Sequence, residues 1–424
     1  MSTIILTQYS GSILGPIAKV LGWIMNWIYL FLANVFGIEN IGITIIVLTI
    51  LIYMCMLPLT IKQQKFSKLQ QKMQPEIKAV QEKYKGKRDQ ESQMAMNEET
   101  QALYAKYGIS PTGTCLPLLL QMPVFLALYR VIYNVPAYVS SVKATFDGVV
   151  DGIIHTAGFQ GIMEKFLESL NLTQQIRADF NNEDMSVVKN FIVDSIYKMP
   201  TSGWEKLSDS FPNLQNVIES TRDQLNHMNA FLGLNISDSP LTIISNSFKE
   251  KSYLLVLLAF LIPLVSYASQ MANIKLMPQA DTDPDNPMAK QMKAMNYTMP
   301  LISVGITFTV PVGLGIYWIF SSLTRGVQQY FVNKHIRNLD LDEMIAKNVE
   351  KRKKKLEKMG ISENQIRSAA KLSTKSNAQL SATMSKAERD SKIEKAYEYR
   401  KTANPNSLTA KANLVKDFNE RNNK

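Results

Sequence analysis

The sequence predicts an all-α polytopic membrane protein with five transmembrane helices, the N-terminus outside and the C-terminus in the cytoplasm. Three apolar runs, 42–59, 116–133 and 253–271, have about the ~20 residues that a helix needs to cross the hydrocarbon core. Two runs that are shorter or more polar, 299–310 and 314–331, flank a VPVG turn and are predicted to pair as a helical hairpin. A bilayer offers backbone groups no water, so all five spans should be helices.

These runs and the segments between them divide the 424-residue chain. The predicted regions are an N-terminal region with an interfacial amphipathic helix (1–40), the first span (41–59), a cytoplasmic helical hairpin (60–110), the second span (111–133), an outer loop with a helical insert (134–252), the third span (253–271), a cytoplasmic loop (272–298), the fourth and fifth spans (299–331) and a basic cytoplasmic tail (332–424).

A sixth apolar stretch, residues 17–37, is predicted to lie in the membrane interface. Lys19, Gly22 and Asn26 fall on one side of a helix, with two tryptophans beside them, as in helices that lie in the membrane plane. An ordinary span is the alternative, although five spans already satisfy the charge distribution. The preceding residues lack a basic region, so a cleaved secretory signal is not expected.

The charges of the connecting segments set the orientation. Residues 59–115 carry a net charge of +4, residues 134–252 a net charge of −5, and the chain from Lys334 onward a net charge of +10. Cytoplasmic segments are enriched in Lys and Arg close to the spans, where Lys62, Lys65, Lys334 and Arg337 lie. The first connecting segment and the tail are therefore placed in the cytoplasm, and the long acidic loop outside.

Two helical stretches, 62–84 and 89–108, follow the first span and are joined by KGKR. Their apolar residues recur at intervals of three and four, which predicts an antiparallel hairpin with a weak seam between the helices. The predicted seam residues are Leu69, Met73, Ile77, Val80, Met94, Leu103 and Tyr107. A solvated spacer without that seam is the alternative.

The outer loop is too long to lack structure, and segments 186–199 and 214–233 have helical periodicity. A small helical insert is therefore expected. His155 and His227 stand alone and the chain has two cysteines, so neither a metal site nor a disulfide framework is predicted. We expect no cofactor, no catalytic residues and no enzymatic activity.

The tail contains the run KRKKKLEK and few apolar residues, which indicates disorder or a helix that forms on contact. Its candidate contact residues are Lys351, Arg352, Lys353, Lys354 and Lys355. Such a charge run suits ribosomal RNA or anionic lipid, and no aromatic platform favours sequence-specific RNA binding.

Polar side chains recur inside the predicted spans, where they are costly and usually face a cavity or a bundle interior. Thr49 and Tyr53 lie one helical turn apart on the first span. Hydroxyls that bond only to their own helix are the alternative for any single Ser or Thr. Arg130 either extends to the outer headgroups or enters a wet cavity between helices. The fourth span has ten residues between Pro300 and Pro311, about 15 Å of helix, which would thin the local bilayer.

Four blocks of sequence resemble the YidC/Oxa family of membrane protein insertases, in the family's order. They are MLPLTIKQQKFSKLQQKMQPEIKAVQEKY after the first span, SPTGTCLPLLLQMPVFLALYRVI, the FLGLNISDSP segment before the third span, and QMKAMNYTMPLI with VPVGLGIYWIFSSLTRGVQQYFVNK. The resemblance covers about 250 residues. The outer insert, at about 140–225, and the far tail lie outside it.

The resemblance implies a hydrophilic, water-filled groove enclosed by the five helices, open to the cytoplasm and to lipid and sealed outside. Thr49 and the pair Tyr317–Trp318 match positions that the family places along the substrate path, and Gln270 is a looser match. The full set of candidate groove residues is Thr49, Tyr53, Gln121, Arg130, Gln270, Tyr317 and Trp318.

One position departs from the family pattern. Five residues before the proline that ends the first span, members of the family typically hold an arginine, whereas this chain has Tyr53. Either Arg130 substitutes for that cation from the neighbouring span, or the groove acts through hydration and thinning alone.

The function that follows from the resemblance is a membrane protein insertase and chaperone of the bacterial plasma membrane, acting alone or with the Sec translocon. Its partners would be nascent membrane proteins, the ribosome, anionic lipids and, for some clients, the Sec translocon, and a monomer is expected. A solute transporter is the rival, but it predicts inverted repeats and intramembrane carboxylates, and the five spans hold no Asp or Glu. A membrane-anchored ribosome or RNA tether is the third hypothesis and fits only the tail.

Overall fold

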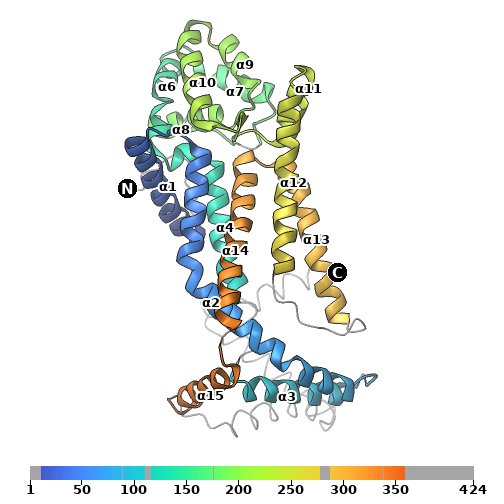
Figure 1. Cartoon of the computed structure of the whole chain (residues 1–424). Helices are drawn as coiled ribbons and strands as arrows, with labels where there is room; N and C mark the ends of the chain where they lie inside the picture. Colours follow the sequence, from blue (N-terminus) through green and yellow to red (C-terminus); the bar gives the residue numbers. More distant parts are fainter. Residues whose placement is uncertain are drawn as a thin grey trace, which may run out of the picture.

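The computed structural model describes residues 11–87, 89–109, 116–174, 176–276, 287–337 and 339–358. Almost all of them are helical. Long helices stand side by side in the middle of the molecule, a globular outer domain lies at one end, and a helical platform lies at the other (Figure 1). The long helices are α1 (Leu14–Phe36), α2 (Ile41–Lys83), α4 (Leu116–Tyr133), α12 (Tyr253–Leu276), α13 (Pro287–Thr309) and α14 (Val312–Arg337).

Helix α14 is central to the bundle, since it packs against α2 and α12, while α13 packs on α12. Of the helices that the structure describes, α1, α2 and α12 are long and apolar enough to cross a membrane. The expected all-helical membrane architecture is thus found, whereas the five-span topology and its orientation remain predictions.

Helix α2 continues from the predicted first span into the predicted helical hairpin without interruption. It contains 43 residues, including Pro58 and Pro75, and is about 65 Å long at ~1.5 Å per residue. That length is about twice the ~30 Å hydrocarbon core. The side chain of Asn40 accepts a hydrogen bond from the Ile43 amide and so caps its first turn. The helix is therefore too long to be a membrane span alone.

The second half of α2 pairs with α3 (Gln90–Lys106) in the predicted antiparallel hairpin. A small apolar cluster joins them, formed by Leu69, Met73, Ile77, Tyr107 and Ile109. Two ion pairs fasten its ends, Lys83 to Glu99 at 2.5 Å and Lys106 to Glu76 at 2.7 Å. The predicted seam is confirmed for its buried members, and the solvated-spacer alternative is wrong.

The first part of the tail forms a helix, α15 (Leu341–Lys358), that packs on this hairpin. Leu341, Met344 and Ile345 add to the apolar cluster, and Lys72 bonds Asp342 at 2.5 Å. Of the two readings of the tail, disorder is therefore wrong for residues 341–358, and a helix held by a contact is what the structure shows. Residues 359–424 lie outside the described residues.

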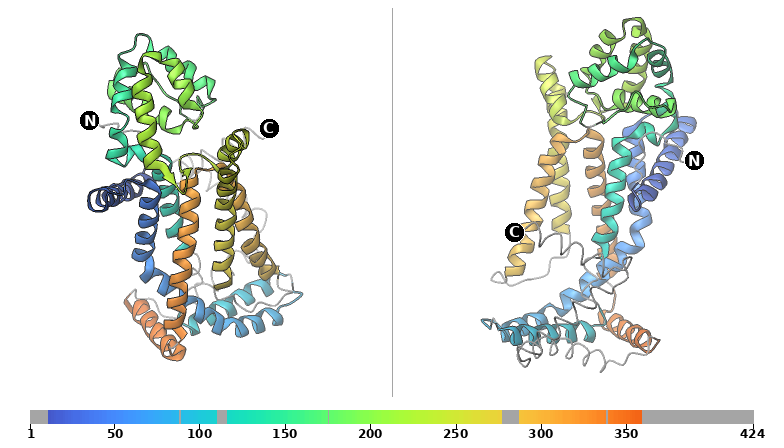
Figure 2. Two further views of the ribbon diagram at one scale, coloured as in Figure 1. Left: turned by 45° about the horizontal axis from the view of Figure 1, so that its top comes forward. Right: turned by 180° about the vertical axis from the view of Figure 1, so that it is seen from behind.

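The outer domain is a compact group of short helices above the bundle (Figure 2). Its elements are η2 (Val135–Ala137), α5 (Ser140–Ala144), α6 (Asp147–Ile154), α7 (Phe159–Ser169), α8 (Met185–Lys198), α9 (Gly203–Ser210), η3 (Pro212–Leu214), α10 (Gln215–Asn229), β1 (Ala230–Phe231) and β2 (Leu234–Asn235). Helix α11 (Pro240–Lys249) stands beside this group and packs on α12 and α13. Helices α8 and α10 confirm the two stretches predicted from periodicity.

The short ribbon β1–β2 corrects the all-α expectation. Its strands are antiparallel, with Ala230 opposite Asn235 and Phe231 opposite Leu234. Leu232 and Gly233 between them both have positive φ, as the two central residues of a tight hairpin turn require. The ribbon is anchored to the bundle because the side-chain amide of Asn40 donates to the Ala230 carbonyl at 2.6 Å.

Helix α13 differs from its predicted span. The helix runs through Pro300 and begins at Pro287, so it has 23 residues instead of the ten between the two prolines. The proline does not end the helix here, and residues 287–298, expected as loop, are helical. The short-span argument for thinning the bilayer is therefore wrong in its stated form.

The small and polar side of α1 is a packing surface. Gly22 lies against the Tyr138 ring, where a Cβ atom would come within 2.1 Å of a ring carbon. The Asn26 side chain accepts hydrogen bonds from the amide and hydroxyl of Ser140, at 3.0 and 3.1 Å. The tryptophans are on the open side, with Trp23 65% exposed and Trp27 62% exposed. Helix α1 thus lies against α4 and the start of the outer domain.

Candidate functional site

Tyr53 of α2 is the meeting point of the predicted groove residues. Its side chain is 4% exposed and interacts electrostatically with the Tyr317 side chain of α14. The Gln121 amide of α4 donates to the Tyr53 hydroxyl at 3.5 Å. The Gln328 amide donates to the Tyr53 carbonyl at 2.7 Å. Helices α2, α4 and α14 thus converge on one tyrosine.

Trp318 forms an aromatic wall next to this point. It stacks on Phe125 of α4 with 6.3 Å between ring centroids and 14° between the planes. Phe125 also contacts the Tyr317 ring, at 6.1 Å. The stacking fixes both residues of the Tyr317–Trp318 pair against α4.

Thr49 lies one turn before Tyr53 and is fully buried. Its hydroxyl donates to the Ile45 carbonyl of its own helix at 2.6 Å, so it is satisfied without water or a partner helix. Ser269, Thr307 and Ser321 likewise donate to their own helices. For these hydroxyls the alternative reading, bonding within the helix, is the one that the structure shows.

A row of buried amides extends the polar contacts toward the hairpin, and these residues were missing from the sequence-based candidates. Gln64 of α2 donates to Gln329 of α14 at 2.6 Å, and Gln329 donates to Asn333 at 2.8 Å. Asn273 of α12 donates to the Ser322 carbonyl at 2.5 Å. The signal in the sequence is the pair Gln328–Gln329, which follows the apolar first half of α14.

Three acceptors in this polar seam have no protein partner among the described residues. They are Gln64 Oε1, Gln328 Oε1 and Ser322 Oγ, all buried. An unsatisfied polar atom in a buried site is costly, and ordered water is the usual partner of such an atom. One of these atoms lies on α2 and two lie on α14.

Gln270 belongs to a separate contact, between α12 and α13. Its amide nitrogen donates to the hydroxyls of Ser303, at 2.8 Å, and Ser266, at 3.1 Å. The Ser303 hydroxyl in turn interacts with Gln270 Oε1 at 3.1 Å. The structure therefore brings together Thr49, Tyr53, Gln121, Tyr317 and Trp318, and places Gln270 in a neighbouring polar pair.

Arg130 and Arg325 lie at different levels of the bundle. Arg130 is nine residues beyond Gln121 on α4, about 13 Å along the axis, and is exposed beside Tyr133 and Lys198 of the outer domain. The cation next to Tyr53 is Arg325 of α14, whose guanidinium lies over the Tyr53 ring at 5.8 Å from the centroid. Arg325 is also exposed, and its Nε donates to the Ser321 carbonyl.

The basic tail residues lie at the far end of α15, past the part that contacts the hairpin. Lys351 and Lys353 are exposed, Arg352 is half-buried, and Lys354 pairs with Glu350 at 2.7 Å. Lys355 is in the helix, but its side chain lies outside the described residues. In the described parts of the chain no group of three or more His, Cys, Asp or Glu side chains could hold a metal ion.

Comparison with known proteins identifies the family. The family model described as "60Kd inner membrane protein" matches residues 31–193 and 207–339, more than half of the chain. Membrane protein insertase YidC 1 of Halalkalibacterium halodurans is 44% identical over 108 residues, 26% of this chain and 41% of that protein. Membrane protein insertase MisCA of Bacillus subtilis is 43% identical over 99 residues, 23% of this chain and 38% of that protein.

A third relative, membrane protein insertase YidC of Bifidobacterium longum, is 36% identical over 143 residues, 33% of this chain and 42% of that protein. The matches span about two fifths of the length of these curated relatives. Their names and the apolar helices together indicate a multi-pass protein of a bacterial membrane. The chain belongs to the 60Kd inner membrane protein family, the YidC/Oxa family of membrane protein insertases.

Proposed function

We propose that this protein is a membrane protein insertase and chaperone that inserts nascent membrane proteins through a hydrated groove between α2, α4 and α14. The observation that carries the proposal is the buried polar seam with its three acceptors that lack a protein partner. A charged side chain at mid-bilayer costs about 2.5–3.5 kcal/mol on insertion scales. A wet, amide-lined seam offsets part of that cost for a hydrophilic client segment.

The surfaces beside the seam suit the apolar part of a client. Large apolar side chains face outward along α12, α13 and α14, among them Leu257, Phe260, Leu301, Leu323 and Val327. An apolar client segment leaving the seam meets apolar side chains on these three helices. Transport of a small solute would not require an apolar, lipid-facing surface beside the seam. The family membership also favours insertion over transport.

We place the protein with α2, α4, α12, α13 and α14 as five spans, its N-terminal side outside and α15 in the cytoplasm. The basic residues near the hairpin and after α14 support this orientation. The outer domain then lies outside the cell. The protein acts alone or with the Sec translocon, as a monomer, without catalysis or a cofactor.

The groove cation in this chain is Arg325. It supplies from the last span the positive charge that the family resemblance leads one to expect at position 53, and it contacts the Tyr53 ring directly. Arg130, at the outer end of α4, instead lies at the level of the outer lipid headgroups. Client segments with acidic residues are therefore attracted to the seam by α14.

The direct test is photo-crosslinking to a ribosome-stalled membrane protein. A crosslinkable residue at Trp318, next to the seam, should capture the client, and one at Ile13, exposed before α1, should not. Equal capture at both positions, or none at Trp318, would remove the groove from the mechanism.

The second role is a ribosome or anionic-lipid contact by the tail, and it rests on the basic end of α15. Replacing Lys351, Arg352, Lys353 and Lys354 by alanine should reduce co-sedimentation with ribosomes at low salt, because phosphate binding is electrostatic. Replacing Lys143, Lys165, Lys189 and Lys206 of the outer domain is the matched control. Unchanged co-sedimentation of the tail variant would exclude this contact.

A further inference from the structure

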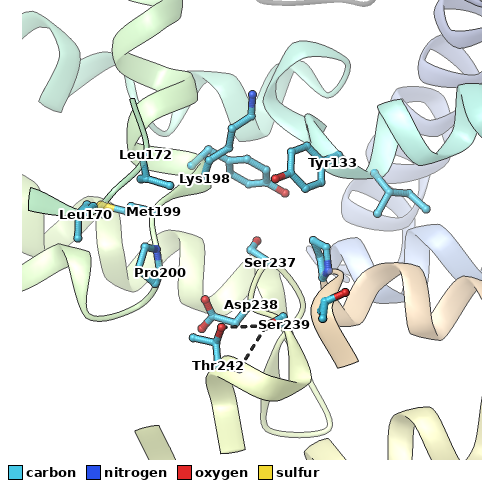
Figure 3. A pocket seen from close by; sticks show the side chains of 14 residues that line it. Tyr133, Leu170, Leu172, Lys198, Met199, Pro200, Ser237, Asp238, Ser239 and Thr242 are labelled. Atoms are coloured by element: carbon cyan, nitrogen blue, oxygen red, sulfur yellow. Dashed lines mark hydrogen bonds between the residues drawn. The ribbon is translucent and has the colours of Figure 1, made fainter. Parts of the chain in front are cut away.

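The outer end of the bundle holds a cavity of about 270 Å³ between the outer domain and the ends of the long helices (Figure 3). Its polar side chains bond within the protein: Ser239 and Thr242 are hydrogen-bonded to each other at 2.8 Å, and the Thr201 hydroxyl donates to Asp238. Figure 3 shows the Lys198 side chain pointing away from Asp238. These contacts do not identify a ligand for the cavity. A better-defined interaction surface lies at the opposite end of the molecule, where α15 meets the hairpin (Figure 1).

Helix α15 covers the hairpin with one face. Its half-buried residues have the spacing i, i+3, i+4, as residues on one side of a helix do, and the residues between them are exposed. The half-buried set is Leu341, Met344, Ile345, Asn348, Val349 and Arg352. The first three of these side chains pack on the apolar cluster of the hairpin. One side of the helix, about three turns long, is therefore the docked face.

The hairpin backbone touches this face at Gly108. Gly108 has a φ of +62°, and a Cβ atom there would lie 2.6 Å from the Val349 amide nitrogen and 2.8 Å from the Asn348 Cβ. Glycine is therefore what allows the two backbones to approach so closely. At the N-terminal end of the face, Lys72 forms an ion pair with Asp342 at 2.5 Å. Apolar, backbone and charge contacts together fix the register of α15 on the hairpin.

The contact is small enough to be reversible. Three apolar side chains of α15 enter the cluster, and the ion pair contributes little because the Asp342 side chain is 82% exposed. Two ion pairs within α15, Glu343–Lys347 and Glu350–Lys354, have the i, i+4 spacing and stabilise the helix by itself. Helix α15 can therefore leave the hairpin without unfolding.

The exposed side of α15 is basic, and its charge run reaches the docked face. Lys347, Lys351 and Lys353 are exposed, whereas Arg352 lies on the docked side. A polyanion that engages the whole run must also reach Arg352, so it competes with the hairpin for α15. We propose that α15 binds either the hairpin or ribosomal RNA, and that a ribosome releases α15 and uncovers the apolar cluster. This inference rests on the ribosome contact proposed above for the tail.

The position of the contact favours RNA over the lipid surface as the polyanion. The predicted first span ends at Leu59, and the cluster residues of α2 begin at Leu69. Ten positions of helix correspond to about 15 Å, which exceeds the ~8 Å over which exposed charges act at physiological salt. Both figures of the whole chain show α15 at the end of the molecule, beyond the long helices (Figures 1 and 2). A ribosome that docks on the hairpin reaches α15 directly.

The first test measures the distance between α15 and the hairpin in the full-length protein, in phosphatidylcholine nanodiscs. Spin labels are attached to Ala102→Cys and Ala346→Cys, two exposed positions, after Cys55 and Cys115 are replaced by serine. Pulsed EPR should give one narrow distance distribution without ribosomes and a longer, broader one when ribosomes saturate the protein. An unchanged distribution at saturation overturns the proposal. A shift caused by phosphatidylglycerol vesicles and not by ribosomes also overturns it, in favour of lipid.

The second test measures the affinity for ribosomes at low salt. Met344→Glu places a charge in the apolar cluster and should undock α15, so the affinity should rise by the factor by which docking lowers it. A helix that is docked about nine tenths of the time gives a rise of about tenfold. Ala346→Glu is the matched control, since it adds the same charge on the exposed side of α15 and should lower the affinity slightly. The two variants should thus change the affinity in opposite directions.

Gly108→Ala is a second undocking variant that changes no charge, and Gly86→Ala is its control. The affinity should rise in the first variant and stay at the wild-type value in the second. Hydrogen exchange of α2 and α3 separates release of α15 from unfolding of the hairpin, and it should match the wild type away from the contact. Equal affinities of the wild type, Met344→Glu and Gly108→Ala overturn the inference and leave the ribosome contact standing. Absence of binding in all of them removes the ribosome contact itself, and the release with it.

Discussion

Removing the positive charge of Arg325 should impair the insertion of clients with acidic translocated segments. The guanidinium lies 5.8 Å from the centroid of the Tyr53 ring, at the point where α2, α4 and α14 converge. A client carboxylate that reaches the Tyr53 hydroxyl would lie roughly 5 Å from that charge. At effective dielectric constants of about 20 to 80, Coulomb's law gives about 0.8–3.3 kcal/mol for such a pair. Arg325 is exposed, so the lower half of that range applies, about 1 kcal/mol.

A loss of about 1 kcal/mol corresponds to a roughly fivefold change in an equilibrium. The assay compares the insertion yields of two clients that differ only in two acidic residues of the translocated segment, in cells depleted of their other insertases. Arg325→Gln should lower the yield of the acidic client about fivefold relative to the neutral one. Arg325→Lys should keep most of the preference, because the charge remains.

The matched control is Arg130→Leu, which removes the other arginine of the bundle at the outer end of α4. It should affect both clients equally and weakly. If Arg325→Gln left the ratio of yields unchanged while Arg130→Leu lowered it, the reasoning from the Tyr53 contact would be refuted, and Arg130 would be the compensating cation. Equal yields in every variant would leave hydration as the mechanism without an electrostatic contribution.

Three further predictions follow from the same contacts. Gln328→Leu removes the hydrogen bond from the Gln328 amide to the Tyr53 carbonyl but also removes a buried oxygen that has no partner. These two effects oppose each other, so the melting temperature should change little, while the yield of hydrophilic clients should fall. A large loss of stability with unchanged insertion would contradict the wet seam. Gly108→Ala should detach α15 from the hairpin, because a Cβ atom at position 108 would come within 2.6 Å of the Val349 amide nitrogen. Gly86→Ala is the control, since Gly86 also has a positive φ but has open space around it. Faster hydrogen exchange of residues 341–358 is expected in the Gly108 variant alone. Hydrogen bonds from Lys106 and Tyr107 lower the pKa of Glu76. The contribution of these bonds to hairpin stability is therefore complete above the unfolded pKa of about 4.3 and is lost as pH falls through the folded value. The protection of the α3 amides, which is the intrinsic exchange rate divided by the observed rate, should fall between about pH 5 and 3 in the wild type, and this fall should be smaller in Glu76→Gln.

Several elements could be read from the sequence because their signal is local. The lengths of the apolar runs predicted the helices α2, α4 and α12. The spacing of Leu69, Met73 and Ile77 predicted the apolar seam of the hairpin. The helical periodicity of the sequence likewise predicted α8 and α10. Each of these features depends on residues a few positions apart, where helix geometry alone decides which side chains share a face.

Other features needed the tertiary structure. Gln64 and Gln329 are 265 positions apart and form one hydrogen bond, and no pattern within α2 or α14 predicts that their faces oppose each other. The same is true of Arg325, whose charge reaches Tyr53 from another helix, and of α15, whose weak apolar face gains a partner only on the hairpin. Periodicity shows which side chains share a face of a helix. Which faces pack together, and hence which polar groups are left for water or a client, is decided by the fit between helices that are distant in the sequence.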